Sequence, residues 1–194
     1  MFRGAPVTVA TGAICLLLAW AGEPLGAGLA WERTGILHGE LWRLWSGHLV
    51  HYSISHAAAD TLVLLAMGLY AEPLVGSRRF GLVLAGAALV LSLGLLALVP
   101  GLQEYRGASA LGVLAAVLGG ALAWHRHPAS RLILCCAALA LASKTLWEAF
   151  AHTAAFTDLP PGVAVAWQAH VLGALLGACA AAACQPVFRR RLTP

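Results

Sequence analysis

The sequence predicts an all-α polytopic membrane protein in which six transmembrane helices form one bundle. Of its 194 residues, 60% are hydrophobic and 10% are charged, and the mean hydropathy is +0.81. A soluble domain carries roughly a quarter charged residues, so most of this chain's surface has to face lipid. Six apolar runs follow one another, each near the ~20 residues that cross ~30 Å of hydrocarbon as a helix. We therefore expect residues 1–194 to form a single membrane domain.

The apolar runs place the expected spans along the chain. They cover residues 7–22, 53–70, 80–99, 108–124, 132–150 and 163–184. The breaks between them are Glu72-Pro73, Pro100-Gly101, Pro128 and Pro160-Pro161-Gly162. We expect the first run to be retained as a span, because one arginine precedes it and Glu23-Pro24 makes a poor cleavage region for a signal peptide.

The longest connection, residues 23–52, joins the first two spans and mixes aromatic with charged residues. It contains Trp31 and the segment Leu41-Trp42-Arg43-Leu44-Trp45. Tryptophan and arginine suit the headgroup layer, where rings and aliphatic stems face the acyl chains and polar ends face water. This composition predicts an interfacial loop on the outer face of the membrane.

The distribution of lysine and arginine sets the expected orientation. With a cytoplasmic N-terminus, the cytoplasmic side holds eight basic residues and the outer side three, while Lys144 lies within a span. This asymmetry favours both termini in the cytoplasm. The net charge of +4 does not indicate nucleic-acid binding, because no patch interleaves basic and aromatic residues. The eight are Arg3, Arg78, Arg79, Arg126, Arg131, Arg189, Arg190 and Arg191, and the three are Arg33, Arg43 and Arg106.

Two polar residues lie near the starts of apolar spans, Ser109 in the fourth and His170 in the sixth. Polar groups in the bilayer are costly and point to function, although a packing serine and a histidine bonded to a backbone carbonyl are the alternatives. Small residues follow each of them at +3, +7 and +11, as stripes along which helices approach closely. If the two stripes pack together, the serine and the histidine meet as nucleophile and base near the outer face. The stripes are Gly112, Ala116 and Gly120 after the serine, and Gly173, Gly177 and Ala181 after the histidine.

Two further pairs of polar residues lie four positions apart on expected helices. His56 and Asp60 share one face near the outer end of the second span, where they could donate hydrogen bonds to a reacting carbonyl oxygen. A zinc site built on the histidines of this region is the alternative, but the chain has no HExxH motif, and we expect no metal and no cofactor. Lys144 and Glu148 form either an intrahelical ion pair, or a pair that positions substrate or orders the region of His170.

The order of these features resembles the rhomboid family of intramembrane serine proteases over essentially the whole chain. The matching features are the Trp42-Arg43 loop, His56-xxx-Asp60, Gly107-Ala108-Ser109 and His170-xx-Gly173-xxx-Gly177. The segment at 39–48, Lys144-xxx-Trp147-Glu148 and the compact length are similar to its rhombosortase branch. That branch is linked to bacterial membrane proteins with a C-terminal sorting tail, which consists of a Gly-Gly motif, a membrane helix and a basic cluster.

The resemblance implies a rhomboid-like bundle in the bacterial inner membrane that cleaves such tailed proteins near its outer face. It implies that Ser109 is the nucleophile and His170 the general base of a dyad without a third acidic member. His56, Asp60 and the Ser109 N–H would stabilise the oxyanion. Rhomboids usually have asparagine at the position of Asp60 and glycine at that of Ala110, so we expect a protonated Asp60 that donates as asparagine does. The alternatives are an inactive rhomboid-like protein that binds membrane clients and a small proton-coupled transporter.

Overall fold

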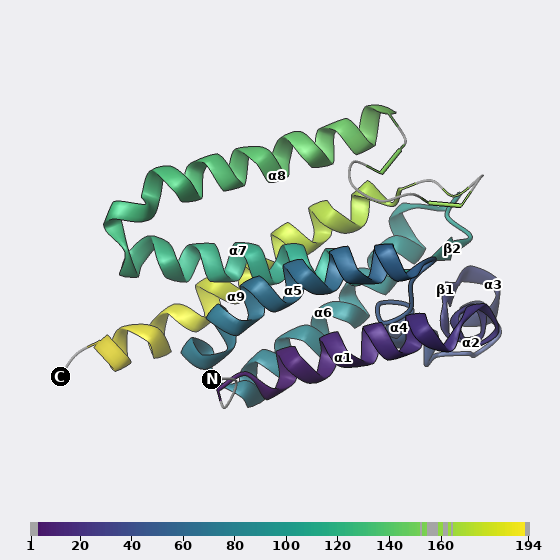
Figure 1. Cartoon of the computed structure of the whole chain (residues 1–194), viewed down its shortest axis with the longest axis horizontal. Coiled ribbons are helices and arrows are strands. Elements are labelled where there is room, and N and C mark those ends of the chain that lie inside the picture. The colour runs from purple at the N-terminus through teal and green to yellow at the C-terminus, as the bar shows by residue number, and fades with distance from the viewer. Residues whose placement is uncertain (1–3, 152, 155–158, 161–162, 164, 193–194) are drawn as a thin grey trace.

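The computed structural model describes residues 4–151, 153–154, 159–160, 163 and 165–192, and most of them are helical. Arg3 lies outside the described residues. Figure 1 shows the long helices running lengthwise, with a group of short elements at one end of the bundle. Helix α1 begins and helix α9 ends at the opposite end (Figure 1). The long helices are α1 (Pro6–Ala21), α5 (Ile54–Val75), α6 (Ser77–Leu98), α7 (Ser109–Arg126), α8 (Arg131–Ala151) and α9 (Trp167–Leu192), with the 3-10 turn η1 (Pro128–Ser130) before α8.

The expected all-α polytopic fold is confirmed, with one difference in its first helix. Within the described part of the chain, five segments are long and apolar enough to cross a membrane: Ile54–Val75, Ser77–Leu98, Ser109–Arg126, Pro128–Ala151 and Trp167–Cys184. The remaining expected span, residues 7–22, is α1, an apolar helix of 16 residues. At ~1.5 Å per residue α1 is ~24 Å long, so it is shorter than the hydrocarbon layer is thick.

The break expected at Glu72-Pro73 is wrong, because α5 continues through Pro73 to Val75. Proline is costly in a helix interior, but here it lies in the last turn. The buried carboxylate of Glu72 accepts hydrogen bonds from the backbone N–H groups of Val7 (3.1 Å) and Thr8 (2.7 Å) and from the Thr8 hydroxyl (2.8 Å). The N–H groups of a first helical turn have no intrahelical partner, so Glu72 caps α1 and fixes its start against the end of α5.

The connection between α1 and α5 is a folded layer, which we call the loop layer (residues 23–52). It contains α2 (Glu23–Leu29), β1 (Trp31–Glu32), α3 (Arg33–Leu37) and α4 (Arg43–Ser46). Strand β1 pairs antiparallel with β2 (Glu104–Tyr105), with Trp31 opposite Tyr105. Since β2 comes shortly before α7, this pairing ties the loop layer to the segment that leads into Ser109.

The loop layer differs from the interfacial loop expected of it in the roles of two residues. Trp31 is fully buried instead of lying among headgroups, whereas Trp42 and Trp45 are exposed as the interfacial interpretation requires. The charged group of Arg33 does not face solvent either. Its guanidinium donates hydrogen bonds to the carbonyls of Leu95, Leu96, Val99 and Leu102. It thereby satisfies carbonyls at the end of α6, which a helix leaves without intrahelical donors.

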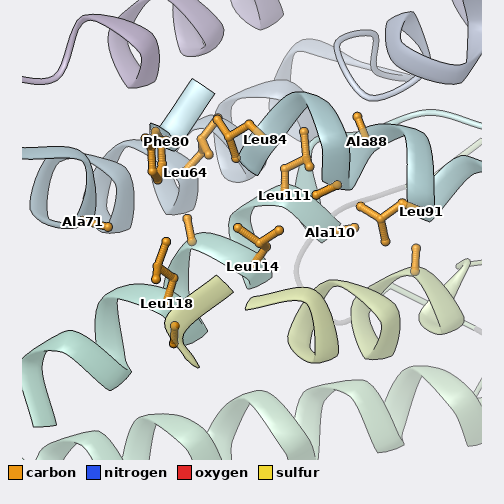
Figure 2. Packing of buried hydrophobic residues seen from close by; sticks show 14 of the residues in the cluster. Leu64, Ala71, Phe80, Leu84, Ala88, Leu91, Ala110, Leu111, Leu114 and Leu118 are labelled. Atoms are coloured by element: carbon orange, nitrogen blue, oxygen red, sulfur yellow. The ribbon is translucent and has the colours of Figure 1, made fainter. Parts of the chain in front are cut away.

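Helix α7 lies at the centre of the apolar core. Figure 2 shows its Leu114 and Leu118 beside buried side chains of α5 and α6, such as Leu64 and Phe80. The expectation that the small residues of α7 pack against α9 is wrong, however. Gly112 faces α5, and no atom lies within 4 Å of where a Cβ at Gly120 would stand.

The stripe of small residues expected on α9 does bring that helix against α7. A Cβ added at Gly173 would lie 2.4 Å from the carbonyl oxygen of Ala110, and one at Gly177 would lie 2.7 Å from that of Leu114. Real Cβ atoms do not approach a backbone so closely, so both positions require glycine. The two helix backbones touch directly, and this contact begins one turn beyond His170.

Candidate active site

Three long helices begin at the end of the bundle that carries the loop layer. Helix α5 begins at Ile54, α7 at Ser109 and α9 at Trp167. The free N–H groups of a first turn give each helix start a partial positive charge, and three such starts at one end of the bundle favour negative charge there. His56, Ser109 and His170 all lie in these first turns, so the fold gathers the predicted site residues at a single end.

Ser109 and His170 form a hydrogen-bonded pair. The Nε2 atom of His170 lies 3.0 Å from the Oγ atom of Ser109. The histidine is buried and the serine is half-buried. The contact depends on the bare backbone of Gly173, one turn beyond His170, because any side chain there would push α9 away from Ala110 next to the serine.

The segment before Ser109 is held in place through the backbone of Gly107. Gly107 has a φ of +139°, and a Cβ there would lie 3.0 Å from Asp60 Oδ2 and 3.3 Å from His56 Nε2. The position therefore requires glycine for its conformation and for its space. The N–H of Gly107 donates to the carbonyl of Gly47 (3.1 Å), and its carbonyl accepts from the Tyr105 hydroxyl (2.9 Å).

The structure adds His51 to the two residues expected on α5. Asp60 Oδ2 lies 3.2 Å from Nε2 of His51 and 3.4 Å from Nε2 of His56. All three side chains are buried. His51 also accepts a hydrogen bond from the backbone N–H of Ala108 at 3.2 Å, directly before the serine. The sequence predicted no role for His51 beside Asp60 and included it only in the zinc alternative, although it stands five residues before His56 in the same polar segment.

Lys144 and Glu148 form the ion pair that their spacing allows, and Glu148 also reaches His170. The Nζ atom of Lys144 donates to Oε1 of Glu148 at 2.6 Å. The other oxygen, Oε2, lies 3.0 Å from Nδ1 of His170. The contact is close, although it does not have the geometry of a well-formed hydrogen bond.

A cavity of about 180 Å³ joins these groups. Burial, with the Glu104 carboxylate nearby, raises the pKa of the Tyr52 phenol, so Tyr52 is a neutral hydrogen-bond donor at its rim. The Arg106 guanidinium lies over the Tyr52 ring at 4.9 Å and is held by Glu23 and Glu104. The polar lining residues are Tyr52, His56, Asp60, Glu104, Tyr105, Arg106, Ser109, Lys144, Glu148 and His170.

The fold and the site define a multi-pass α-helical membrane protein with a serine–histidine pair in contact at one end of its helical bundle. The model of the Rhomboid domain matches residues 38–186, and the chain belongs to the rhomboid family. It is similar to Rhomboid protease GluP of Bacillus subtilis (strain 168), with 35% identity over 100 residues. That match covers 52% of this chain and 19% of the relative, so the similar part is about a fifth of the relative's length.

Proposed function

We propose that this protein is an intramembrane serine endopeptidase. The observation that carries the proposal is the 3.0 Å contact between Ser109 Oγ and His170 Nε2, in a cavity within the helical bundle. A serine hydroxyl is too weak an acid to attack a peptide unaided, and a histidine at this distance can take its proton. Ser109 attacks the substrate carbonyl, and the protonated His170 gives the proton to the leaving amine. Water then releases the acyl group with His170 again as base.

The same cavity offers donors for the oxyanion. The backbone N–H of Ser109 stands in the first turn of α7, where amides have no intrahelical acceptor. His56 and Asp60 line the cavity with Ser109, and both approach Gly107 closely. We assign His56, Asp60 and this N–H to oxyanion stabilisation, with Asp60 protonated.

The proposed substrates are membrane-anchored proteins with a C-terminal Gly-Gly motif, a helix and a basic cluster, as the rhombosortase-like segments of the sequence suggest. The proposed location is the bacterial inner membrane, with cytoplasmic termini and cleavage near the outer face. The ends of the helices support this orientation. Arg78 and Arg79 at the start of α6, and Arg126 and Arg131 between α7 and α8, stand at the end of the bundle opposite the loop layer.

The second candidate is a rhomboid-like protein that binds membrane clients without cleaving them. Two positions favour it, since Asp60 and Ala110 replace the asparagine and glycine usual in rhomboids. An ionised Asp60 would repel an oxyanion, and cleavage would then fail although the serine and histidine are in contact.

Replacement of the serine separates the two candidates. Ser109→Ala and His170→Ala should each abolish cleavage of a tailed protein that is co-expressed with this chain. Mass spectrometry of the C-terminus of the tailed protein measures the cleavage. The double variant should be no worse than either single one, because the pair acts as a unit. Ser143→Ala, an exposed serine on α8, is the matched control and should cleave normally. Cleavage that survives in both single variants would contradict the assignment, and client binding without cleavage by the intact chain would favour the second candidate.

A further inference from the structure

We propose that Glu148 is a positioning residue that completes a Ser109–His170–Glu148 chain, an inference that rests on the proposed protease function. Each ring nitrogen of His170 contacts one of the other two residues. Nε2 lies 3.0 Å from the Ser109 hydroxyl, and Nδ1 lies 3.0 Å from the Glu148 carboxylate. A carboxylate at Nδ1 and a hydroxyl at Nε2 is the arrangement that activates a nucleophilic serine in a triad.

The burial of Glu148 indicates that its contact with His170 is more than a helix-stabilising ion pair. Helix α8 exposes most of its surface, and of its residues, all of which the structure describes, Glu148 alone is buried. An intrahelical Lys–Glu pair forms equally well on an exposed face of a helix and needs no burial. A buried carboxylate is costly unless it is paired and hydrogen-bonded. The one residue that α8 buries is therefore the one whose carboxylate reaches the histidine of α9.

Lys144 prepares Glu148 for this role. Its ammonium holds Oε1 at 2.6 Å and keeps the carboxylate charged in the apolar surroundings, while Oε2 is directed to Nδ1. Ammonium, carboxylate and imidazole thus form one row that ends at the serine. The ion pair between Lys144 and Glu148 therefore also helps to orient His170.

The chemical consequence concerns the tautomer of His170. A carboxylate at Nδ1 favours the form in which Nδ1 carries the proton, which leaves the lone pair of Nε2 toward Ser109. When His170 takes the serine proton, Glu148 stabilises the imidazolium and does not itself become protonated.

Glu148→Gln tests the proposal with almost no change in shape. The kcat for cleavage of a tailed protein should fall by ~10²–10⁴-fold, because the amide can donate to Nδ1 and favour the wrong tautomer, and KM should change by less than about threefold. The double variant Lys144→Met/Glu148→Gln leaves no charge unpaired and should show the same loss of kcat. Thr145→Val on the same helix is the control, and its kinetics should match those of the intact chain.

A spectroscopic measurement keeps the proposal testable apart from activity. In the Ser109→Ala variant with ¹⁵N-labelled histidine, His170 should carry its proton on Nδ1, and the added Glu148→Gln change should move that proton to Nε2. Unchanged kcat in both Glu148 variants, a loss confined to KM, or an unchanged tautomer would overturn the positioning role. The protease proposal itself fails separately, if the intact chain neither cleaves nor reacts with a serine-directed phosphonate.

Discussion

Asp60 occupies a position at which the choice between a charged and a neutral group decides what the site can do. The buried carboxyl group lies within 3.2 Å of His51 and 3.4 Å of His56, and it borders the backbone of Gly107. A carboxylate there would orient the two imidazoles, whereas a protonated acid would also donate a hydrogen bond. The second state is the one we propose, because a protonated acid donates a hydrogen bond as the asparagine usual in rhomboids does.

Substitution of Asp60 distinguishes these two states. Asp60→Asn keeps a donor and removes the charge, so kcat/KM should stay within a few-fold of the intact chain. Asp60→Ala removes the donor and should lower kcat by up to ~10²–10³-fold, the loss typical of one oxyanion donor. Cleavage kinetics in detergent or liposomes measure both. An inactive but folded Asp60→Asn would show that a carboxylate is required, and a fully active Asp60→Ala would leave the role to His56 and the serine N–H.

At the scale of the elements, the contact between α7 and α9 sets the distance between Ser109 and His170. The two helices touch through backbone, at Gly173 on Ala110 and at Gly177 on Leu114. The serine and histidine stand at one end of this contact, on different helices. Their 3.0 Å separation is therefore a property of the helix pair and not of either residue alone.

Gly173→Ala should separate the pair. The new methyl would stand 2.4 Å from a carbonyl oxygen, so α9 has to shift or tilt. Displacement of a catalytic group by about 1 Å can cost ~10²-fold in rate, and overpacking typically costs ~1–3 kcal/mol of stability. We expect kcat to fall by at least ~10²-fold and the thermal midpoint of unfolding to drop.

Gly120→Ala is the matched control for this substitution, because no atom lies within 4 Å of the added methyl and alanine is a better helix former. Its activity and stability should equal or exceed those of the intact chain. Equal activity in Gly173→Ala and Gly120→Ala would show that the helix contact does not set the site geometry.

At the scale of the whole molecule, the loop layer is joined to the bundle through buried polar contacts. His48 is fully buried, and its Nε2 lies 3.0 Å from the Ser92 hydroxyl and 3.1 Å from the carbonyl of Ala88, both on α6. Burial, opposed in part by the hydrogen bond to Ala88, lowers the pKa of His48 from 6.5 to about 4. The folded protein therefore favours the neutral imidazole more than the unfolded chain does.

This difference predicts how stability depends on pH. Between pH 6.5 and about 4 the unfolded chain binds a proton that folded His48 does not, so the free energy of unfolding should fall as the pH falls through this window. The loss contributed by His48 should reach about 3 kcal/mol near pH 4 and be absent above pH 7. Unfolding in detergent at several pH values measures it. His48→Gln should flatten this part of the curve, while the exposed His38→Gln should leave it unchanged, and equal curves for both would contradict the assignment.

Most of the fold could be predicted from the sequence, because hydropathy alone sets where a chain can cross lipid. The expected spans agree with the helices to within a few residues at most ends, and the α9 glycines predicted its contact with α7. The orientation of α7 could not be read from its sequence, because small residues occupy several of its faces. Gly112 accordingly meets α5 and not α9.

The sequence placed the catalytic candidates on the correct helix ends but did not reveal their neighbours. Ser109 and His170 stand out as polar residues in apolar runs, and the structure brings them into contact. The role of His51 depends on where the irregular segment between α4 and α5 passes, and no periodic pattern encodes that path. Likewise, the spacing of Lys144 and Glu148 indicated their ion pair, while the approach of Glu148 to His170 follows from how α8 sits against α9.

The hydrogen bonds of the loop layer also constrain the order in which the protein can be built. Arg33 binds carbonyls that lie 62 to 69 positions later in the chain, and the partner of Glu23, Arg106, lies 83 positions later. Ribosomes add ~5–20 residues per second, so residues 23–52 emerge several seconds before the groups that complete them. In that interval the layer has its own internal contacts, such as the hydrogen bonds of Arg43 to Ala30 and of Ser46 to Leu29. The later partners of Arg33 and Glu23 are still missing. The end of the molecule that carries the loop layer therefore gains these contacts only after residues 95–106 have been made, although residues 23–52 are synthesised early.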